Sequence, residues 1–194
     1  MIHYASKQIT DFLLSNKIIE EHETEIYVYG YEAFISGVID IFIALIIGAI
    51  FKNTVNTIIF LMEFISVRIY AGGYHAKTYV KCKLIFSMIA ISVMIIPKFD
   101  LPLVFSVLVI LGFLLIVFAF APIENKNKPL DSEQKDVSRK ISRMLSVLWS
   151  IAAVLTYFYF TSISNTIICT TLFIVLLMAE EIPGKKVLSD EKSR

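Results

Sequence analysis

Cysteine and histidine are both scarce in this chain of 194 residues, which holds two cysteines and three histidines. Cys82 and Cys169 cannot build the multi-disulfide framework of a small secreted domain. A zinc site needs three or four ligands, and His3 and His22 lie in an N-terminal region that is unrelated to His75. The sequence therefore predicts no metal site and no cofactor.

Net charge is equally low. Charged residues make up 18% of the chain and leave a formal net charge of +1. Such a balance favours no nucleic-acid partner. The sequence also shows no cleavable signal peptide, no internal repeat and no low-complexity tract. We therefore expect a single domain over residues 1–194.

Apolar residues, in contrast, are abundant: 57% of the chain is hydrophobic, and the mean hydropathy is +0.73. They gather in six blocks, which are Tyr31–Phe51, Thr54–Tyr70, Leu84–Ile96, Leu101–Phe120, Met144–Thr161 and Thr166–Ala179. Crossing a bilayer takes about 20 helical residues. The third block is shorter, so it must begin upstream near Thr78 or be a re-entrant segment. The sixth block is also short, so its helix must extend beyond the block at both ends.

The N-terminal segment, residues 1–30, differs in pattern from these blocks. Tyr4, Ile9, Phe12, Leu13 and Ile19 recur at roughly helical spacing. This spacing predicts an amphipathic helix in the membrane interface. The fold class is thus an all-α polytopic membrane protein, with about six transmembrane helices after an amphipathic helix.

Lysine and arginine in the connecting segments give the orientation. With the N-terminus inside, 16 of the 18 basic residues lie on the inner side, and only Lys52 and Lys98 lie outside. The positive-inside rule therefore predicts that both termini and a basic loop at 121–143 are cytoplasmic. Cys82 and Cys169 would then lie at opposite leaflets.

The segment 68–83, which reads RIYAGGYHAKTYVKCK, carries the candidate chemistry. A Gly-Gly pair allows a sharp turn before His75. If a helix starts near Thr78, Cys82 lies about one turn inside its N-terminal end, where the helix dipole favours a thiolate. Without further context, Cys82 can equally be a small apolar filler, and His75 a loop residue bonded to a backbone carbonyl.

Two stretches resemble the AgrB family of Gram-positive quorum-sensing membrane proteins. The run Arg68–Cys82 reads R-x-x-x-G-G-Y-H-A-x-x-x-x-x-C, which is similar to that family's core motif. The second stretch, Ala121–Leu130 (APIENKNKPL), is similar to its polar loop. Both stretches occur in the family's order, and the hydrophobic layout agrees over nearly the whole chain.

The resemblance implies a cysteine endopeptidase of the bacterial cell membrane that processes an AgrD-like propeptide. By matching position, Cys82 is the nucleophile and His75 the base. The propeptide's acidic tail would leave, and an internal Cys or Ser would close a thiolactone or lactone ring. A homodimer is the assembly we expect of a small helical membrane enzyme.

Other residues receive less definite roles. Arg68 would pair with a substrate carboxylate or anchor the loop, and Gly72 and Gly73 would shape the backbone. Lys126 and Lys128 would bind the acidic tail of the propeptide, or would only contribute to the orientation of the protein in the membrane. Glu32 is our first candidate for an acid that orients His75, ahead of Glu63 and Asp40 nearer the membrane centre. Glu63 and Asp40 can equally be protonated and hydrogen-bonded between helices, and the site can also work without an acid.

Competing interpretations stay open at this point. A peptide exporter without proteolytic activity needs no nucleophile and would survive Cys82→Ser. An intramembrane metalloprotease needs clustered ligands that the sequence does not show. A structural subunit would leave the Gly-Gly-x-His pattern without a purpose.

Overall fold

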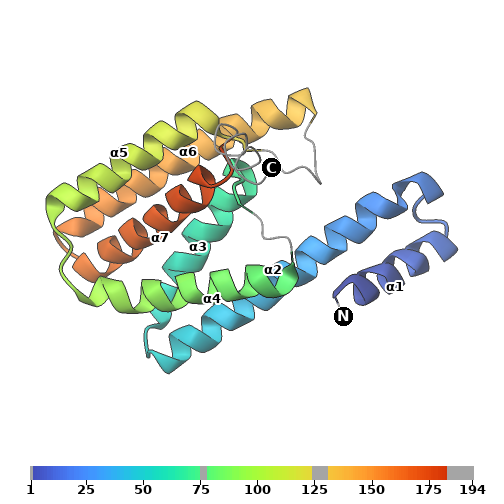
Figure 1. The fold of residues 1–194 in the computed structure, drawn as a ribbon, viewed down its shortest axis with the longest axis horizontal. Helices are drawn as coiled ribbons and strands as arrows, with labels where there is room; N and C mark the ends of the chain where they lie inside the picture. Colours follow the sequence, from blue (N-terminus) through green and yellow to red (C-terminus); the bar gives the residue numbers. More distant parts are fainter. Residues whose placement is uncertain (1, 75–77, 124–130, 183–194) are drawn as a thin grey trace, which may run out of the picture.

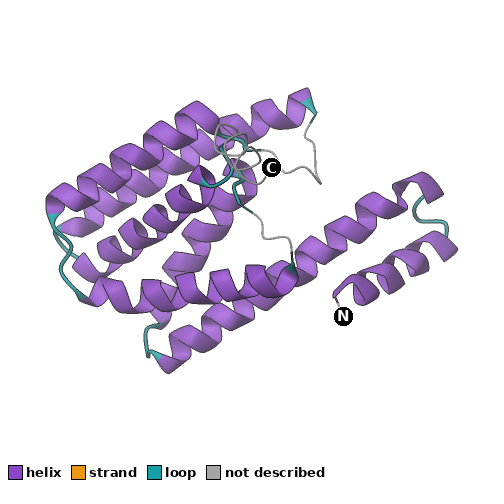
Figure 2. Cartoon of the chain, in the orientation of Figure 1, coloured by secondary structure: helices purple, strands orange, loops and turns teal. Residues whose placement is uncertain are grey.

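A computed structural model describes residues 2–74, 78–123 and 131–182 of the chain. Within these ranges the chain is helical and has no strand, which confirms the all-α fold class (Figure 2). The elements are α1 (Ile2–Ser15), η1 (Glu21–Glu23), α2 (Thr24–Ile50), α3 (Thr54–Ala71), α4 (Tyr79–Ile95), η2 (Ile96–Lys98), α5 (Leu103–Phe120), α6 (Ser132–Tyr157) and α7 (Thr161–Ala179).

Helix α7 forms the centre of the bundle and packs against α3, α4, α5 and α6 (Figure 1). Helix α2 crosses α4, and its N-terminal half continues beyond the bundle with α1 packed beside it. The C-terminal ends of α3, α5 and α7 and the N-terminal end of α6 lie at one end of the bundle.

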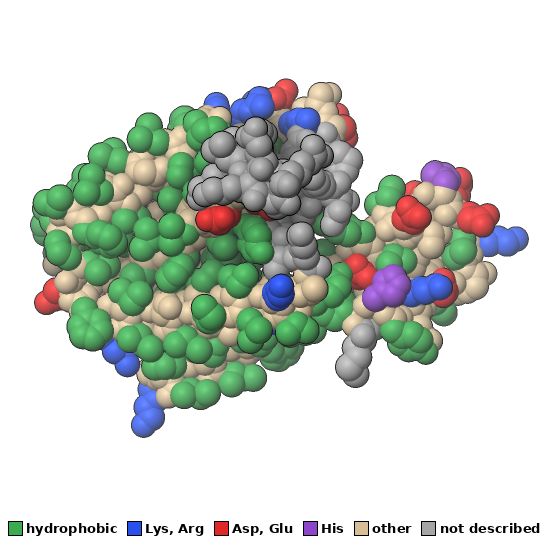
Figure 3. All heavy atoms as spheres, viewed as in Figure 1, with side chains coloured by type: hydrophobic (Ala, Val, Ile, Leu, Met, Phe, Trp, Pro, Cys, Tyr) green, Lys and Arg blue, Asp and Glu red, His purple; other side chains and the backbone are tan. Residues whose placement is uncertain are grey.

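Five helices are long and apolar enough to cross a membrane: α2, α3, α4 with η2, α5 and α7. Figure 3 shows apolar side chains over the middle of the bundle, with charged side chains toward its two ends. The fifth apolar block, Met144–Thr161, lies mostly in α6, whose N-terminal turns are charged from Glu133 to Arg143. By length and composition the described residues thus hold five candidate spans rather than six.

Small residues let α6 lie close to its neighbours. Ser142, Ser146, Ser150 and Ala153 recur along the buried face of the helix. The Ser146 hydroxyl donates to the Arg143 carbonyl at 2.8 Å, and the Ser150 hydroxyl to the Ser146 carbonyl at 2.7 Å. Because each hydroxyl is satisfied within its own helix, the stripe allows close helix packing at little polar cost.

Several predicted boundaries can now be compared with the structure. Helix α4 begins at Tyr79, with Thr78 as its N-cap. This confirms the upstream start of the third block, and η2 extends the helix to Lys98. The predicted loop 121–143 is shorter than expected because α6 begins at Ser132. Likewise α2 begins at Thr24, inside the predicted N-terminal segment.

Candidate active site

The chain turns sharply at Gly72 and Gly73, directly after α3. Their φ angles are +74° and +116°, a region that side chains with a Cβ rarely occupy. A Cβ at Gly72 would collide with the Ile123 carbonyl, and one at Gly73 with the Arg68 guanidinium. Both positions therefore need glycine for conformation and for space.

Arg68 holds this turn from the last part of α3. Its Nη1 donates to the Gly72 carbonyl at 2.8 Å, and its Nη2 donates to the Tyr74 carbonyl at 2.7 Å. The guanidinium also lies over the Phe64 ring, 5.9 Å from its centroid. Of the two roles predicted for Arg68, these contacts support the loop anchor.

Two segments that are distant in the sequence bind this turn through backbone hydrogen bonds. The Ile123 amide donates to the Ala71 carbonyl at 2.9 Å, beside a parallel bridge between Gly72 and Ile123. The Tyr74 amide donates to the Leu177 carbonyl of α7 at 2.9 Å. The two sequence motifs that carry the resemblance are therefore in direct contact, and α7 completes the support.

Cys82 lies in the first turn of α4 and is partly exposed. Its amide donates to the Thr78 carbonyl at 3.1 Å, as the N-cap requires. The residue lines a cavity of about 540 Å³ between α2, α3 and α4. The rest of the lining is formed by Tyr29, Ala33, Phe34, Gly37, Val38, Asp40, Ile41, Leu61, Phe64, Ile65, Arg68, Ile69, Tyr74, Ile85, Phe86, Ile89 and Leu177.

An ion pair next to Cys82 joins α4 to α2. Lys83 Nζ lies 2.8 Å from Asp40 Oδ1, and both side chains are largely buried. Lys83 also donates to the carbonyl and the hydroxyl of Ser36. The sequence alone did not reveal Lys83 as the partner of Asp40. The signal was a lysine inside an apolar segment, which requires a partner there.

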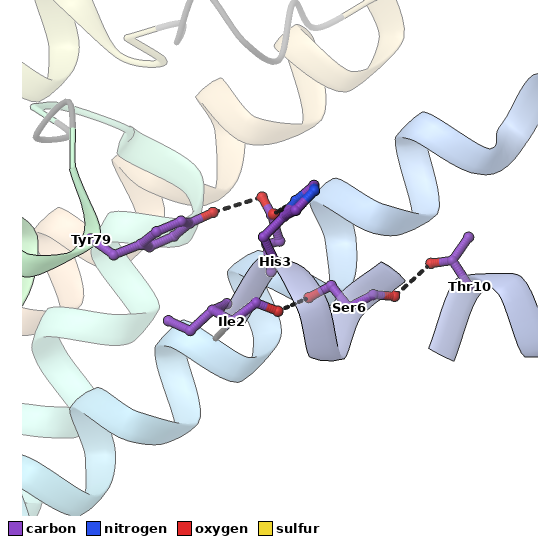
Figure 4. A network of polar contacts seen from close by, with 6 residues as sticks. Ile2, His3, Ser6, Thr10 and Tyr79 are labelled. Carbon is purple, nitrogen blue, oxygen red and sulfur yellow. Dashed lines mark hydrogen bonds and ion pairs between the residues drawn. The ribbon is translucent and has the colours of Figure 1, made fainter. Parts of the chain in front are cut away.

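Glu32 takes part in a network at the start of α4 (Figure 4). Its Oε1 lies 2.6 Å from His3 Nδ1 of α1, and its Oε2 accepts a hydrogen bond from the Tyr79 hydroxyl at 2.6 Å. Glu32 thus links the N-terminal helix to the first residue of the helix that carries Cys82. No pattern in the sequence had marked Tyr79 as a site residue.

Three predicted site residues, His75, Lys126 and Lys128, lie outside the described residues. The role of Glu32 toward His75 therefore stays a prediction. Glu63 is buried between α3 and α7, where it accepts a 2.6 Å hydrogen bond from the Thr171 hydroxyl, and it does not line the cavity. Among the described residues, no group of three or more His, Cys, Asp and Glu is placed to hold a metal ion.

Comparison with known proteins agrees with the two motifs. The family model described as "Accessory gene regulator B" matches residues 6–178. A putative AgrB-like protein of Clostridium perfringens (strain SM101 / Type A) is 33% identical over 143 residues, which cover 70% of this chain and 67% of that protein. The FsrB protein of Enterococcus faecalis is 25% identical over 142 residues, which cover 69% of this chain and 59% of that protein. No solved structure matches the chain. The match over residues 6–178 shows that the chain belongs to the AgrB family of accessory gene regulator proteins.

Proposed function

We propose that this protein is a membrane cysteine endopeptidase that cleaves an AgrD-like propeptide and transfers the acyl product to an internal nucleophile. AgrB proteins take part in quorum sensing, where the family is associated with peptide processing. The observation that carries the proposal is the position of Cys82. It lies in the first turn of α4, in the wall of a cavity that is also lined by Arg68 and Tyr74 of the turn segment.

In the first step, His75 accepts the proton of the Cys82 thiol, and the thiolate attacks the carbonyl of the scissile peptide bond. A C–S bond forms and the C–N bond breaks. The tail of the propeptide leaves as an amine, which takes a proton from His75. The product is an acyl-enzyme thioester on Cys82.

In the second step, the thiol or hydroxyl of a Cys or Ser within the propeptide attacks the thioester. The Cys82 thiolate leaves and is reprotonated, and the ring closes as a thiolactone or lactone. A thioester retains the reactivity that ring closure needs, provided that water is kept away from it. The apolar cavity beside Cys82 supports this requirement.

The described contacts give Arg68, Gly72 and Gly73 positioning roles. They fix the backbone through Tyr74, directly before His75 in the sequence. Lys126 and Lys128 belong to the segment that follows Ile123, and Ile123 is bonded to this turn. We assign these two lysines to the acidic tail of the propeptide. We place the catalytic segment at the cytoplasmic face of the bacterial cell membrane, as the basic residues indicate.

The mechanism is tested by trapping its intermediate. A propeptide whose ring-forming residue is changed to Ala should leave a covalent adduct on the enzyme, because the first step needs no internal nucleophile. Hydroxylamine should release the adduct, and Cys82→Ala should never form it. His75→Ala should slow its formation by roughly two to four orders of magnitude. Cleavage of the Ala propeptide to a free acid at the normal rate would instead make the protein a hydrolase.

The variant Cys82→Ser separates the enzyme from a peptide exporter without proteolytic activity. An exporter needs no nucleophile, so Cys82→Ser would leave secretion of a preformed cyclic peptide intact. We expect Cys82→Ser to abolish processing, measured as uncut propeptide in the membrane fraction.

A further inference from the structure

The cavity beside Cys82 extends into the bundle along α4. Cys82, Ile85, Phe86 and Ile89 line it at helical spacing. Seven residues of α-helix cover about 10 Å, so the cavity reaches well below the nucleophile. Its volume of about 540 Å³ is in the usual range for the site of a small organic ligand. We call this space the α2–α4 slot.

The charged groups of the slot already have polar partners within the protein. Asp40 is bound by Lys83, and the Arg68 guanidinium is bound to the carbonyls of Gly72 and Tyr74. Apart from these groups and two tyrosines, the lining side chains are apolar. A carboxylate inside the slot would lose its hydration, and the one lysine or arginine among the described lining residues, Arg68, already uses Nη1 and Nη2 to hold the turn. The slot is therefore suited to apolar groups.

Gly37 leaves open space in the α2 wall of the slot. A Cβ added there would have no atom within 4 Å. No neighbouring element therefore requires glycine at this position by close approach. Glycine weakens a helix, so its presence calls for another reason. Since Gly37 lines the slot, the missing side chain keeps room for a ligand.

We propose that the α2–α4 slot binds the large apolar side chain that precedes the scissile bond of the substrate. This inference rests on the proposed function, since it takes Cys82 as the nucleophile. The acyl group joined to Cys82 has the slot beside it, while an acidic leaving tail would meet mostly apolar side chains there and an Arg68 that is engaged in holding the turn. The substrate is thereby oriented: its apolar acyl side enters the bundle, and its tail lies toward the cytoplasmic loops.

Peptide chloromethyl ketones test the slot without any turnover of substrate. The Cys82 sulfur attacks the methylene carbon, a C–S bond forms, and chloride leaves. Three reagents are compared, acetyl-Ala-Ala-Phe-, acetyl-Ala-Ala-Ala- and acetyl-Ala-Ala-Asp-chloromethyl ketone. They are applied to the full chain in detergent micelles, with Cys82→Ala as the blank. Rates are measured by mass spectrometry and divided by the rate of each reagent with glutathione.

We expect the Phe reagent to modify Cys82 about tenfold faster than the Ala reagent, as an apolar pocket of this kind discriminates. The Asp reagent should be slower than both. Gly37→Phe should bring the Phe and Ala rates within about twofold of each other, because its ring fills the slot. Gly30→Phe is the matched control: it lies on the same helix and is equally open, but it does not line the slot. Gly30→Phe should keep the full preference for the Phe reagent over the Ala reagent.

The inference is overturned if the wild-type protein reacts equally fast with the Phe and Ala reagents, as it would if lipid filled the slot. Equal effects of Gly37→Phe and Gly30→Phe would overturn it as well. If Gly37→Phe reacts with the Ala reagent at the wild-type rate, the variant is folded. If the variant does not fold, the preference of the wild-type protein between the Phe and Ala reagents decides whether the inference holds. Failure of the proposed function appears separately, as an intact propeptide despite normal labelling.

Discussion

Arg68 holds the Gly-Gly turn through a geometry that another cation does not reproduce. Its planar guanidinium reaches two carbonyls at once, those of Gly72 and Tyr74. Lysine carries the same charge on a single nitrogen and cannot reproduce this fork. Charge alone would make Lys an adequate substitute, so the geometry predicts a loss where a simple charge argument predicts none.

We expect Arg68→Lys to slow adduct formation on Cys82 by roughly tenfold to a hundredfold, since misplacing a catalytic group by about 1 Å has an effect of this size. The measurement is the single-turnover rate with the Ala-substituted propeptide. Arg143→Lys is the control, because Arg143 also donates to a helix-end carbonyl, that of Phe118 at 2.8 Å, away from the turn. Equal rates for the two variants would assign Arg68 to general packing.

Glycine positions give a second prediction at this scale. Gly72→Ala and Gly73→Ala should each lower processing by more than about tenfold, because a positive φ costs a residue with a Cβ roughly 1–2 kcal/mol and each Cβ meets an occupied position. Gly112→Ala in α5 is the control, since its Cβ would have no atom within 4 Å. Processing is followed in membranes after the amount of each variant is equalised. Full activity of Gly72→Ala would contradict the described turn.

Between elements, the contact of α2 with α4 depends on the Asp40–Lys83 ion pair. Removal of one partner leaves a largely buried charge, which costs roughly 3–5 kcal/mol. Asp40→Asn and Lys83→Met should therefore each destabilise the protein strongly. The double variant, Asp40→Asn with Lys83→Met, should lose less stability than the sum of the losses of the two single variants. Thermal unfolding in micelles measures all three variants. Additive effects would mean that the two side chains act independently.

Local pattern predicted the helices well, because hydropathy and capping are properties of neighbouring residues. The start of α4 is an example: Thr78 accepts a hydrogen bond from the Lys81 amide at 3.4 Å. The early start of α6 also had a local signal that was not used. Asp131 accepts from the Gln134 amide at 2.7 Å, in the spacing of an N-terminal cap. Predicted loop 121–143 should therefore have ended near Asp131.

The candidate site was predictable only where one segment supplies it. Arg68, Gly72, Gly73 and Cys82 share a single stretch of sequence, and the motif revealed all four. The α2–α4 slot and the Lys83 ion pair arise from helices that meet only in the folded bundle. No sequence spacing records that Gly37 faces the same cavity as Cys82.

At the scale of the whole molecule, the arrangement of charge predicts one orientation in the membrane. The end of α3, the start of α6 and the end of α7 lie at one end of the bundle, and the α2–α3, α4–α5 and α6–α7 connections lie at the other. Among the described residues, Arg68 of α3 and Lys135, Arg139, Lys140 and Arg143 of α6 belong to the first end, while Lys52 and Lys98 belong to connections at the other. The positive-inside rule predicts that the first end is cytoplasmic.

Two single-cysteine variants test this orientation in a background with Cys82→Ala and Cys169→Ala. Asp100→Cys lies in the exposed connection between η2 and α5, and Glu133→Cys lies in the exposed first turn of α6. Both replace an acidic residue, and acidic residues contribute little to orientation, so neither change disturbs the topology. A membrane-impermeant maleimide added to intact cells should label Asp100→Cys and leave Glu133→Cys unmodified, and lysis should make both reactive. Labelling of Glu133→Cys in intact cells would place the catalytic segment outside, where a cytoplasmic propeptide could not reach Cys82.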